Sequence, residues 1–319
     1  MIITVTPNPS IDRTVTFPRL RRGAVNRASS SRVDPGGKGV NVARALTSQG
    51  TATVAVLPVG GPEGHLLEEL LSEAGVARHG VPISGSVRLN ISAVEPDGTT
   101  TKLNEPGPTL DGDETRRLVA AVPSCIESAG GVPVWVVACG SLPHGVPEDL
   151  YAQLVRSAHA AGAKVAVDSS GAPLRPAVDA GPDLIKPNRV ELEELVGADL
   201  PTLGAVIDAA RHLVTHGVGA VAVSLGRDGA VLVDAETTVY ARATIERPLS
   251  TVGAGDCLLA GLLHDLSSGA DAAHALRTGV LWSAAAVRLP GSQVPEPTDL
   301  DGIPVAVTTT PDRSLAVRD

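Results

Sequence analysis

The stretch "STVGAGDCLLAGLL", residues 250–263, places small residues and one carboxylate directly ahead of a leucine stripe. Its leucines recur at helical spacing as far as Leu266, and Gly269 follows as a stop signal, so we predict a helix that begins near Gly255. Asp256 then lies in the first helical turn, where a carboxylate complements the helix dipole. A helix cap alone would explain this residue, so its chemistry has to be judged from the rest of the chain.

Strand-like apolar runs alternate with helical patterns along most of the chain. The strand-like runs are residues 51–60, 132–140, 164–170, 183–188 and 220–226. This alternation predicts an α/β fold in which a central, mostly parallel sheet is flanked by helices.

Two segments break the alternation. Residues 10–35 and 87–105 are typical of antiparallel ribbons, the second turning at "EPDG", and neither has a helix of its own to cover it. We expect them to form a small β-sheet lid on a single domain of residues 1–290. Residues 291–319 are then a C-terminal tail rich in Pro, Asp and Thr, whose last dozen residues we expect to be loose.

The composition excludes several classes of protein. The formal net charge of -9 and the aromatic content of 2% argue against nucleic acid or an anionic membrane surface as a partner. The three cysteines are widely separated and the histidines lack metal-ligand spacing, which argues against a disulfide scaffold or a bound transition metal. Because we find neither a signal peptide nor an apolar run of membrane length, we expect a cytoplasmic protein.

Two glycine-rich segments have the composition of anion-binding loops. In "DPGGKGVNVARAL" (residues 34–46), backbone N–H groups and one ammonium group can converge on an anion at a helix start. It is not a Walker A loop, because Arg32 and Gly39 stand where that motif needs Gly and Ser or Thr. "GAGDCL" is not a dinucleotide fingerprint, since Leu258 replaces the last glycine. Taken singly, each loop is as well explained by a tight turn.

Two further segments follow predicted strands, where ligands gather in open α/β sheets. A hairpin turn is the simpler interpretation of "SLGRDGA", residues 224–230. In "KPNRVELEEL", Lys186 and Asn188 end a strand and Glu191 lies in the next helical turn. Glu191 is either part of a solvated helix face or a carboxylate that holds a hydrated Mg²⁺ near a polyphosphate.

The ordered set "NPSID", "GGKGVNVA", "GSLP", "KPN..E", "SLG..GA" and "TVGAGD" resembles the ribokinase-like sugar kinases of the phosphofructokinase-B type, over the chain to about residue 290. The resemblance implies a ribokinase-like fold with ATP and Mg²⁺ as cofactors. Within that family, "SVRLNISAVEPDGTTTKLNEPGP" and "DSSG" are most similar to members that convert D-fructose 1-phosphate to the 1,6-bisphosphate. Fructose 6-phosphate and tagatose 6-phosphate stay open as substrates. A non-catalytic sugar-phosphate sensor is the alternative of another class.

The resemblance also implies roles for individual residues. Asp256 would be the base that takes a proton from the sugar hydroxyl, while Gly253, Ala254 and Gly255 would offer N–H groups to the transferring phosphoryl group. The implied sugar-phosphate contacts are Asp12, Gly37, Asn41, Asn90 and Ser141, with Lys38, Arg88 and Arg27 as cations. The implied nucleotide contacts are Lys186, Asn188, Glu191, Ser224, Gly226, Gly229 and Thr251, with Glu191 reaching Mg²⁺ through water.

Some of these residues have plainer explanations, and some positions depart from the family. Asp12 would otherwise form a turn, Gly37 a close helix contact, Asn41 part of a first helical turn and Ser141 a strand-end cap. Cys257 stands where relatives commonly carry Ser or another small residue, and Ser283 where they often carry Asn near adenine, and neither touches the implied chemistry directly. A monovalent-cation site near residues 250–252 stays open, and a homodimer formed through the lid is an expected assembly.

Overall fold

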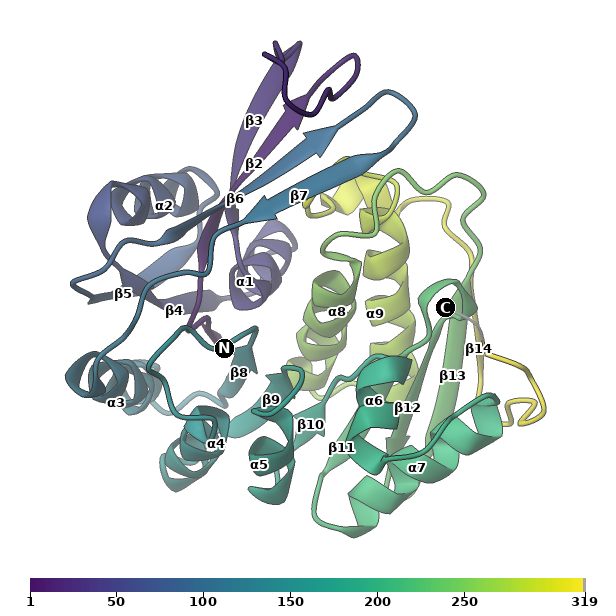
Figure 1. Cartoon of the computed structure of the whole chain (residues 1–319). Helices are drawn as coiled ribbons and strands as arrows, with labels where there is room; N and C mark the ends of the chain where they lie inside the picture. Colours follow the sequence, from purple (N-terminus) through teal and green to yellow (C-terminus); the bar gives the residue numbers. More distant parts are fainter. Residues whose placement is uncertain (318–319) are drawn as a thin grey trace.

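The computed structural model describes residues 1–317 and contains one large and one small sheet. The large sheet has ten strands in the order β14-β13-β12-β11-β10-β9-β8-β1-β4-β5 (Figure 1). The strands from β5 to β11 in this order pair in parallel, and β12, β13 and β14 add an antiparallel edge. Their bounds are β1 (Ile2–Val5), β4 (Thr53–Val59), β5 (Ala77–Pro82), β8 (Trp135–Cys139), β9 (Lys164–Asp168), β10 (Leu184–Ile185), β11 (Ala220–Ser224), β12 (Ala230–Asp234), β13 (Thr238–Ala243) and β14 (Val305–Thr308).

Helices cover both faces of the large sheet, as the alternating pattern predicted. Apolar side chains of α1, α8 and α9 pack on one face and those of α3 to α7 on the other, while α2 packs beside α1. None of the helices within residues 1–317 is long and apolar enough to span a bilayer. Their bounds are α1 (Lys38–Ser48), α2 (Gly61–Glu73), α3 (Gly112–Ser128), α4 (Leu150–Ala160), α5 (Leu174–Asp179), α6 (Arg189–Val196), α7 (Leu203–Thr215), α8 (Ala254–Ser268) and α9 (Ala272–Ala286).

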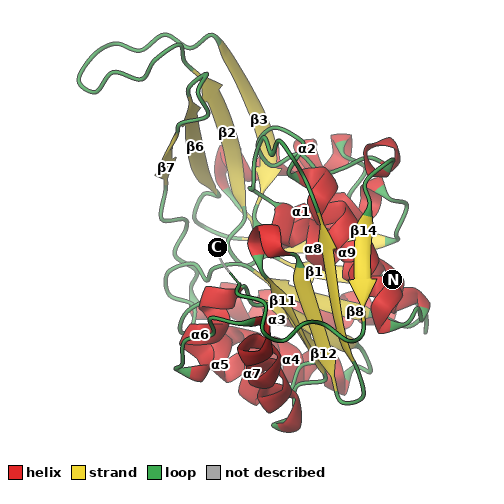
Figure 2. Cartoon of the chain, turned by 90° about the vertical axis from the view of Figure 1, so that its right-hand side faces the viewer, coloured by secondary structure: helices red, strands yellow, loops and turns green. Residues whose placement is uncertain are grey.

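The small sheet has the order β3-β2-β6-β7 and projects from the body of the molecule (Figures 1 and 2). Its strands are β2 (Ser10–Thr16), β3 (Ser30–Gly36), β6 (Arg88–Val94) and β7 (Thr100–Asn104). The two antiparallel ribbons expected from sequence are confirmed as β2–β3 and β6–β7, and a parallel β2–β6 pairing joins them into one sheet.

The expectation of a loose C-terminus is wrong for the described residues. Strand β14 pairs antiparallel with β13 and so extends the large sheet by one strand. Val317 is 6% exposed, and its N–H donates to the carbonyl of Pro201 at 3.1 Å. The polar composition of the tail concealed a short, half-exposed edge strand, which needs few apolar residues. Residues 318–319 lie outside the described residues.

Candidate active site

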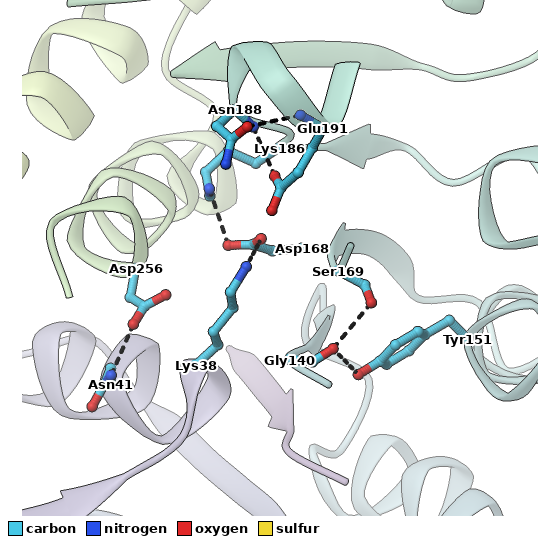
Figure 3. Close-up of polar contacts among 10 residues, drawn as sticks. All are labelled: Lys38, Asn41, Gly140, Tyr151, Asp168, Ser169, Lys186, Asn188, Glu191 and Asp256. Carbon is cyan, nitrogen blue, oxygen red and sulfur yellow. Dashed lines mark hydrogen bonds and ion pairs between the residues drawn. The ribbon is translucent and has the colours of Figure 1, made fainter. Parts of the chain in front are cut away.

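The carboxyl ends of neighbouring parallel strands bring polar residues to one edge of the large sheet. Asp168 is the last residue of β9, Lys186 directly follows β10, and Ser224 is the last residue of β11. Because β9, β10 and β11 are adjacent and parallel, these residues share one edge of the sheet. Figure 3 shows Lys38, Lys186 and Asp256 pointing toward the same space around Asp168.

Asp168 lies at the centre of this cluster and was not assigned from the sequence. Its Oδ1 is 2.8 Å from Lys38 Nζ and its Oδ2 is 3.0 Å from Lys186 Nζ. Asp168 is 1% exposed and Lys186 4%, so the carboxylate depends on these two ammonium groups for its charge. Burial alone would raise the pKa of Asp168, but Lys186 and Lys38 hold it below its ordinary value. The signal in the sequence was "DSSG" at the end of a buried strand.

Asp256 lies in the first turn of α8, as predicted, and is 7% exposed. Its Oδ2 accepts a hydrogen bond of 2.8 Å from Asn41 Nδ2. Burial and then the negative charge of Asp168 raise the pKa of Asp256 to about 6, while Asn41, Lys38 and Lys186 act in the opposite direction. A carboxylate with a pKa near neutrality is suited to accept a proton from a hydroxyl group.

The turn before Asp256 has the geometry of an anion-binding helix start. Gly253 caps α8 with φ of 79°, a left-handed conformation that favours glycine. A Cβ atom on Gly255 would lie 3.5 Å from Lys186 Nζ, so the first turn of α8 faces this lysine. The N–H of Ala254 donates to the carbonyl of Thr251 at 3.4 Å, within the turn that leads into the helix. The N–H of Ala254 is thus already bonded, and it is the helix dipole that makes this start favourable for a phosphate group.

The small sheet presents a polar row to the site. Its register aligns Asp34, Asp12, Asn90 and Asn104 across four strands, and side chains alternate between faces along each strand. Asp12 Oδ1 accepts hydrogen bonds from Ser10 Oγ at 2.7 Å and from Asn90 Nδ2 at 3.0 Å. Asp12 and Asn90 were assigned from the sequence and are brought together, whereas Asn104 was missed because its strand was not aligned with β6.

Arg88, Asn8 and Ser141 form a second polar group beside this row. The Arg88 Nη2 donates to the Asn8 carbonyl at 3.2 Å, and Asn8 Nδ2 donates to Ser141 Oγ at 3.3 Å. Within residues 1–317, the buried Arg88 Nε has no hydrogen-bond partner, and neither have the side-chain oxygens of Asn8, Asn41 and Asn90. Buried polar atoms of this kind call for a ligand or water to satisfy them. Asn8 was missed, although "NPSID" contains it.

The segment around Asn188 is held by a helix cap and by a bridge to the neighbouring strand. Asn188 Oδ1 accepts from the Glu191 N–H and Glu191 Oε2 accepts from the Asn188 N–H, both at 2.8 Å, which caps α6. Asn188 also pairs with Ser224, the last residue of β11, in an isolated parallel bridge. The turn from Gly226 to Gly229 joins β11 and β12 as a hairpin, and a Cβ on Gly229 would come within 2.2 Å of the Ala241 carbonyl.

Comparison with known proteins identifies a family that covers most of this chain. Residues 6–299 match the family described as pfkB family carbohydrate kinase. The chain belongs to this family. It is 38% identical to a 1-phosphofructokinase of Rhodobacter capsulatus over 308 residues, 96% of each chain, and 41% identical to one of Xanthomonas campestris over 82% of each. A solved structure of phosphofructokinase-2 from Escherichia coli, in complex with substrates and products, has a TM-score of 0.88 and 33% identity over 95% of this chain and 97% of that one. The same bacterial enzyme is described in a tetrameric inhibited form, with a TM-score of 0.87 over the same shares.

In this pfkB kinase, the cations expected to bind the sugar phosphate have different partners. Lys38 pairs with one carboxylate oxygen of Asp168, and Lys186 pairs with the other. Arg88 donates to the Asn8 carbonyl and interacts electrostatically with Asp12. Arg27 is exposed in the loop that joins β2 and β3, and no described contact brings it to the site.

Two more expected residues of the pfkB site lie in backbone turns. Gly37 caps α1 with φ of 108°, and a Cβ there would come within 2.8 Å of Thr6 Cγ2. Thr251 is exposed in the loop before α8.

The residues present fit a magnesium ion that is held mainly by phosphates and water. No group of three or more His, Cys, Asp or Glu side chains that would hold a metal occurs within residues 1–317. Asp168 already pairs with two lysines, and Glu191 uses one carboxylate oxygen to cap α6. Mg²⁺ commonly keeps several waters and takes its other ligands from nucleotide phosphates, which suits a site with few carboxylates.

Proposed function

We propose that this chain transfers the γ-phosphoryl group of ATP to the 6-hydroxyl of D-fructose 1-phosphate, giving D-fructose 1,6-bisphosphate. The observation that carries the proposal is a buried Asp256 with a pKa of about 6, beside two lysines that share Asp168. The similarity to relatives named 1-phosphofructokinase, over most of this chain, supports the choice of sugar phosphate.

In the proposed reaction, Asp256 accepts the hydroxyl proton while the oxygen attacks the γ-phosphorus, and the bond from this phosphorus to the β,γ-bridging oxygen breaks to release ADP. Phosphoryl transfer needs positioning and stabilisation of negative charge more than covalent help. The turn from Gly253 to Gly255 offers backbone donors at a helix N-terminus, and Lys186 lies against it. Lys38, on the other oxygen of Asp168, adds a second positive charge next to the same space.

Mg²⁺, when bound, would neutralise charge on the β- and γ-phosphates, with Glu191 in reach through water. The residues from Ser224 to Gly229, together with Asn188 and Thr251, would contact the nucleotide. On the sugar side, Arg88 would bind the 1-phosphate, while Asp12, Asn90, Asn41 and Ser141 would bind hydroxyl groups. The small sheet would then act as a lid that excludes water from the reaction.

D-fructose 6-phosphate is the second candidate substrate. A solved structure of E. coli phosphofructokinase-2 in complex with fructose 6-phosphate has a TM-score of 0.86 with this chain at 32% identity. The same cations would bind either sugar phosphate, because a guanidinium group recognises the phosphate and not the hydroxyl that is free. We further propose that the enzyme is cytoplasmic and assembles as a homodimer through the small sheet.

A coupled assay of ADP release tests the proposal, with D-fructose 1-phosphate, D-fructose 6-phosphate and D-tagatose 6-phosphate compared at equal concentration. We expect the highest kcat/KM with D-fructose 1-phosphate and no turnover in excess chelator. Asp256→Asn should lower kcat by about 10²–10⁴-fold while the fold is kept. Binding of sugar phosphate without ADP release by the parent chain would instead identify a sensor.

A further inference from the structure

The carbonyl oxygen of Gly140 accepts two side-chain hydrogen bonds that the proposed mechanism does not use. Tyr151 OH donates to it at 2.8 Å and Ser169 Oγ at 3.0 Å (Figure 3). These two bonds use both lone pairs of the oxygen. The N–H of Gly140 donates in turn to the carbonyl of Asp168 at 3.0 Å. Gly140 is therefore fixed on both its donor and its acceptor side.

Neither hydroxyl is needed for apolar packing. Tyr151 is fully buried, and it is one of two tyrosines in 319 residues. A buried hydroxyl destabilises a fold unless it is hydrogen-bonded, and phenylalanine would fill the same space without this requirement. Burial raises the pKa of Tyr151 well above its ordinary value, so the phenol remains a donor. Ser169, which directly follows β9 and is 2% exposed, donates its hydroxyl to the same Gly140 carbonyl.

The bonded peptide lies between two parts of the proposed site. Ser141 is the next residue, and its Oγ accepts a hydrogen bond from Asn8 Nδ2. The backbone carbonyl of Asn8 in turn accepts one from Arg88 Nη2. On the other side, Ser169 directly follows Asp168, which pairs with both lysines. Gly140 has φ of 101°, a backbone conformation that glycine adopts readily and other residues rarely.

We propose that Tyr151 and Ser169 are positioning residues that hold the Gly140–Ser141 turn against the end of β9. Through this turn they set the position of Ser141, and with it the Asn8 side chain, toward the sugar phosphate. The proposal rests on the proposed function. Neither side chain touches the substrate, so the effect on the reaction passes through Ser141.

Kinetics of Tyr151→Phe, Ser169→Ala and the double variant test this role. Each single variant leaves one hydroxyl on the Gly140 carbonyl, so we expect KM for D-fructose 1-phosphate to rise about three- to fivefold. The double variant leaves the part-buried Gly140 carbonyl without either hydroxyl donor and should raise this KM about thirtyfold or more, above the product of the single effects. KM for ATP should change less than about twofold. Ser128→Ala is the matched control, since it removes a hydroxyl that donates to the Ser124 carbonyl at 2.8 Å on α3.

A second measurement does not use the Tyr151→Phe/Ser169→Ala double variant and so stands if that protein does not fold. Tyr151→Phe is introduced into a Ser141→Ala background, where its effect on KM for the sugar phosphate should fall below about 1.5-fold. Equal effects in both backgrounds, or a loss of stability with unchanged KM, would overturn the positioning role. If the parent chain turns over none of the three sugar phosphates, the proposed function fails; if it is active and both single variants keep its KM, only this inference fails.

Discussion

Ionisation of Asp256 lowers the stability of the folded protein, and the same surroundings make this carboxylate a better proton acceptor. Burial and the neighbouring Asp168 both oppose its negative charge, which leaves its pKa at about 6 instead of near 4. An acceptor with this pKa is ionised at neutral pH and still basic enough to take a proton from a sugar hydroxyl. The same surroundings that make the carboxylate basic also strain the folded state.

Asp256→Asn should therefore stabilise the protein at neutral pH while it removes activity. The folded-state pKa lies above the unfolded one, so ionisation of Asp256 lowers stability as pH rises between about 4 and 6, and the full cost is present above about pH 6. We expect the free energy of unfolding at pH 7.5 to rise by about 1–3 kcal/mol in urea titrations and to be unchanged near pH 4. Asp199→Asn, at an exposed carboxylate, is the control. A variant less stable than the parent at pH 7.5 would contradict the cost assigned to this charge.

Asp168→Asn should move the acid limb of the kcat–pH profile to lower pH. The negative charge of Asp168 raises the pKa of Asp256, while Lys38 and Lys186 lower it. Loss of Asp168 removes the first effect and leaves the two ammonium groups without their counter-charge, so both changes lower the pKa of Asp256. We expect a shift of about 0.5–1 pH unit, together with a fall in kcat of about tenfold or more. An acid limb that stays in place would mean that another group controls it.

Residues of the site could be predicted where a local motif carries them. Asp256 and Asn188 stand beside glycines or prolines that mark a turn, and the structure places both at helix starts. Asp168 begins the polar stretch at the end of one strand and Asn8 lies between two prolines after another, and polar residues of this kind are common at any strand end. Their importance depends on β9 lying between β8 and β10, and on β6 bringing Arg88 to Asn8. Strand order is a property of the whole fold and leaves no local mark in the sequence.

Side chains of the small sheet alternate between its two faces, and the face on which Arg88 lies indicates its role. Arg88 pairs with Ser10 in the register, two residues before the Asp12 and Asn90 pair, so all four share the polar face. Its guanidinium group is half-buried. Burial lowers the pKa of Arg88, and the negative charge of Asp12 raises it by a smaller amount. An anionic ligand is the group that would compensate this burial.

Arg88→Ala should raise KM for the sugar phosphate about ten- to hundredfold and leave KM for ATP nearly unchanged. Charge-assisted hydrogen bonds contribute about 1.5–3 kcal/mol, which corresponds to this range. Arg13→Ala is the control, because Arg13 lies on β2 next to Asp12 and on the opposite face. Equal increases for both substrates would identify Arg88 as a structural residue.

At the level of elements, long periodic patterns predicted the fold well and short ones did not. Helix α8 ends at Gly269 as its leucine spacing predicted, and the turn at "EPDG" joins β6 and β7. Strand β14 was missed because its four residues are half-exposed and stand among Pro, Asp and Thr. Its place is fixed by pairing with β13, a tertiary contact that composition does not encode.

The whole molecule brings together groups that are far apart in the chain. Lys38 and Asp168 are separated by 130 residues, and Asn41 and Asp256 by 215. Both pairs bridge α1 to the ends of other elements, so the polar cluster forms only when the large sheet and its helices are complete. The small sheet projects from the body of the molecule, and its face opposite Asp12 takes no part in this polar cluster.

That face carries the apolar side chains expected of a contact between two copies. Leu103 is 60% exposed on β7, and the register aligns it with Ile91, Arg13 and Val33 on the face opposite Asp12, so three of the four residues in this row are apolar. Light scattering should give a dimer for the parent chain and a monomer for Leu103→Lys at the same concentration, because a buried ammonium group opposes association. Val132→Lys, at a position 51% exposed ahead of β8, should leave the dimer intact. A monomeric parent, or a dimer that persists in Leu103→Lys, would show that the small sheet is not the dimer contact. Its exposed apolar face would then have no partner in solution.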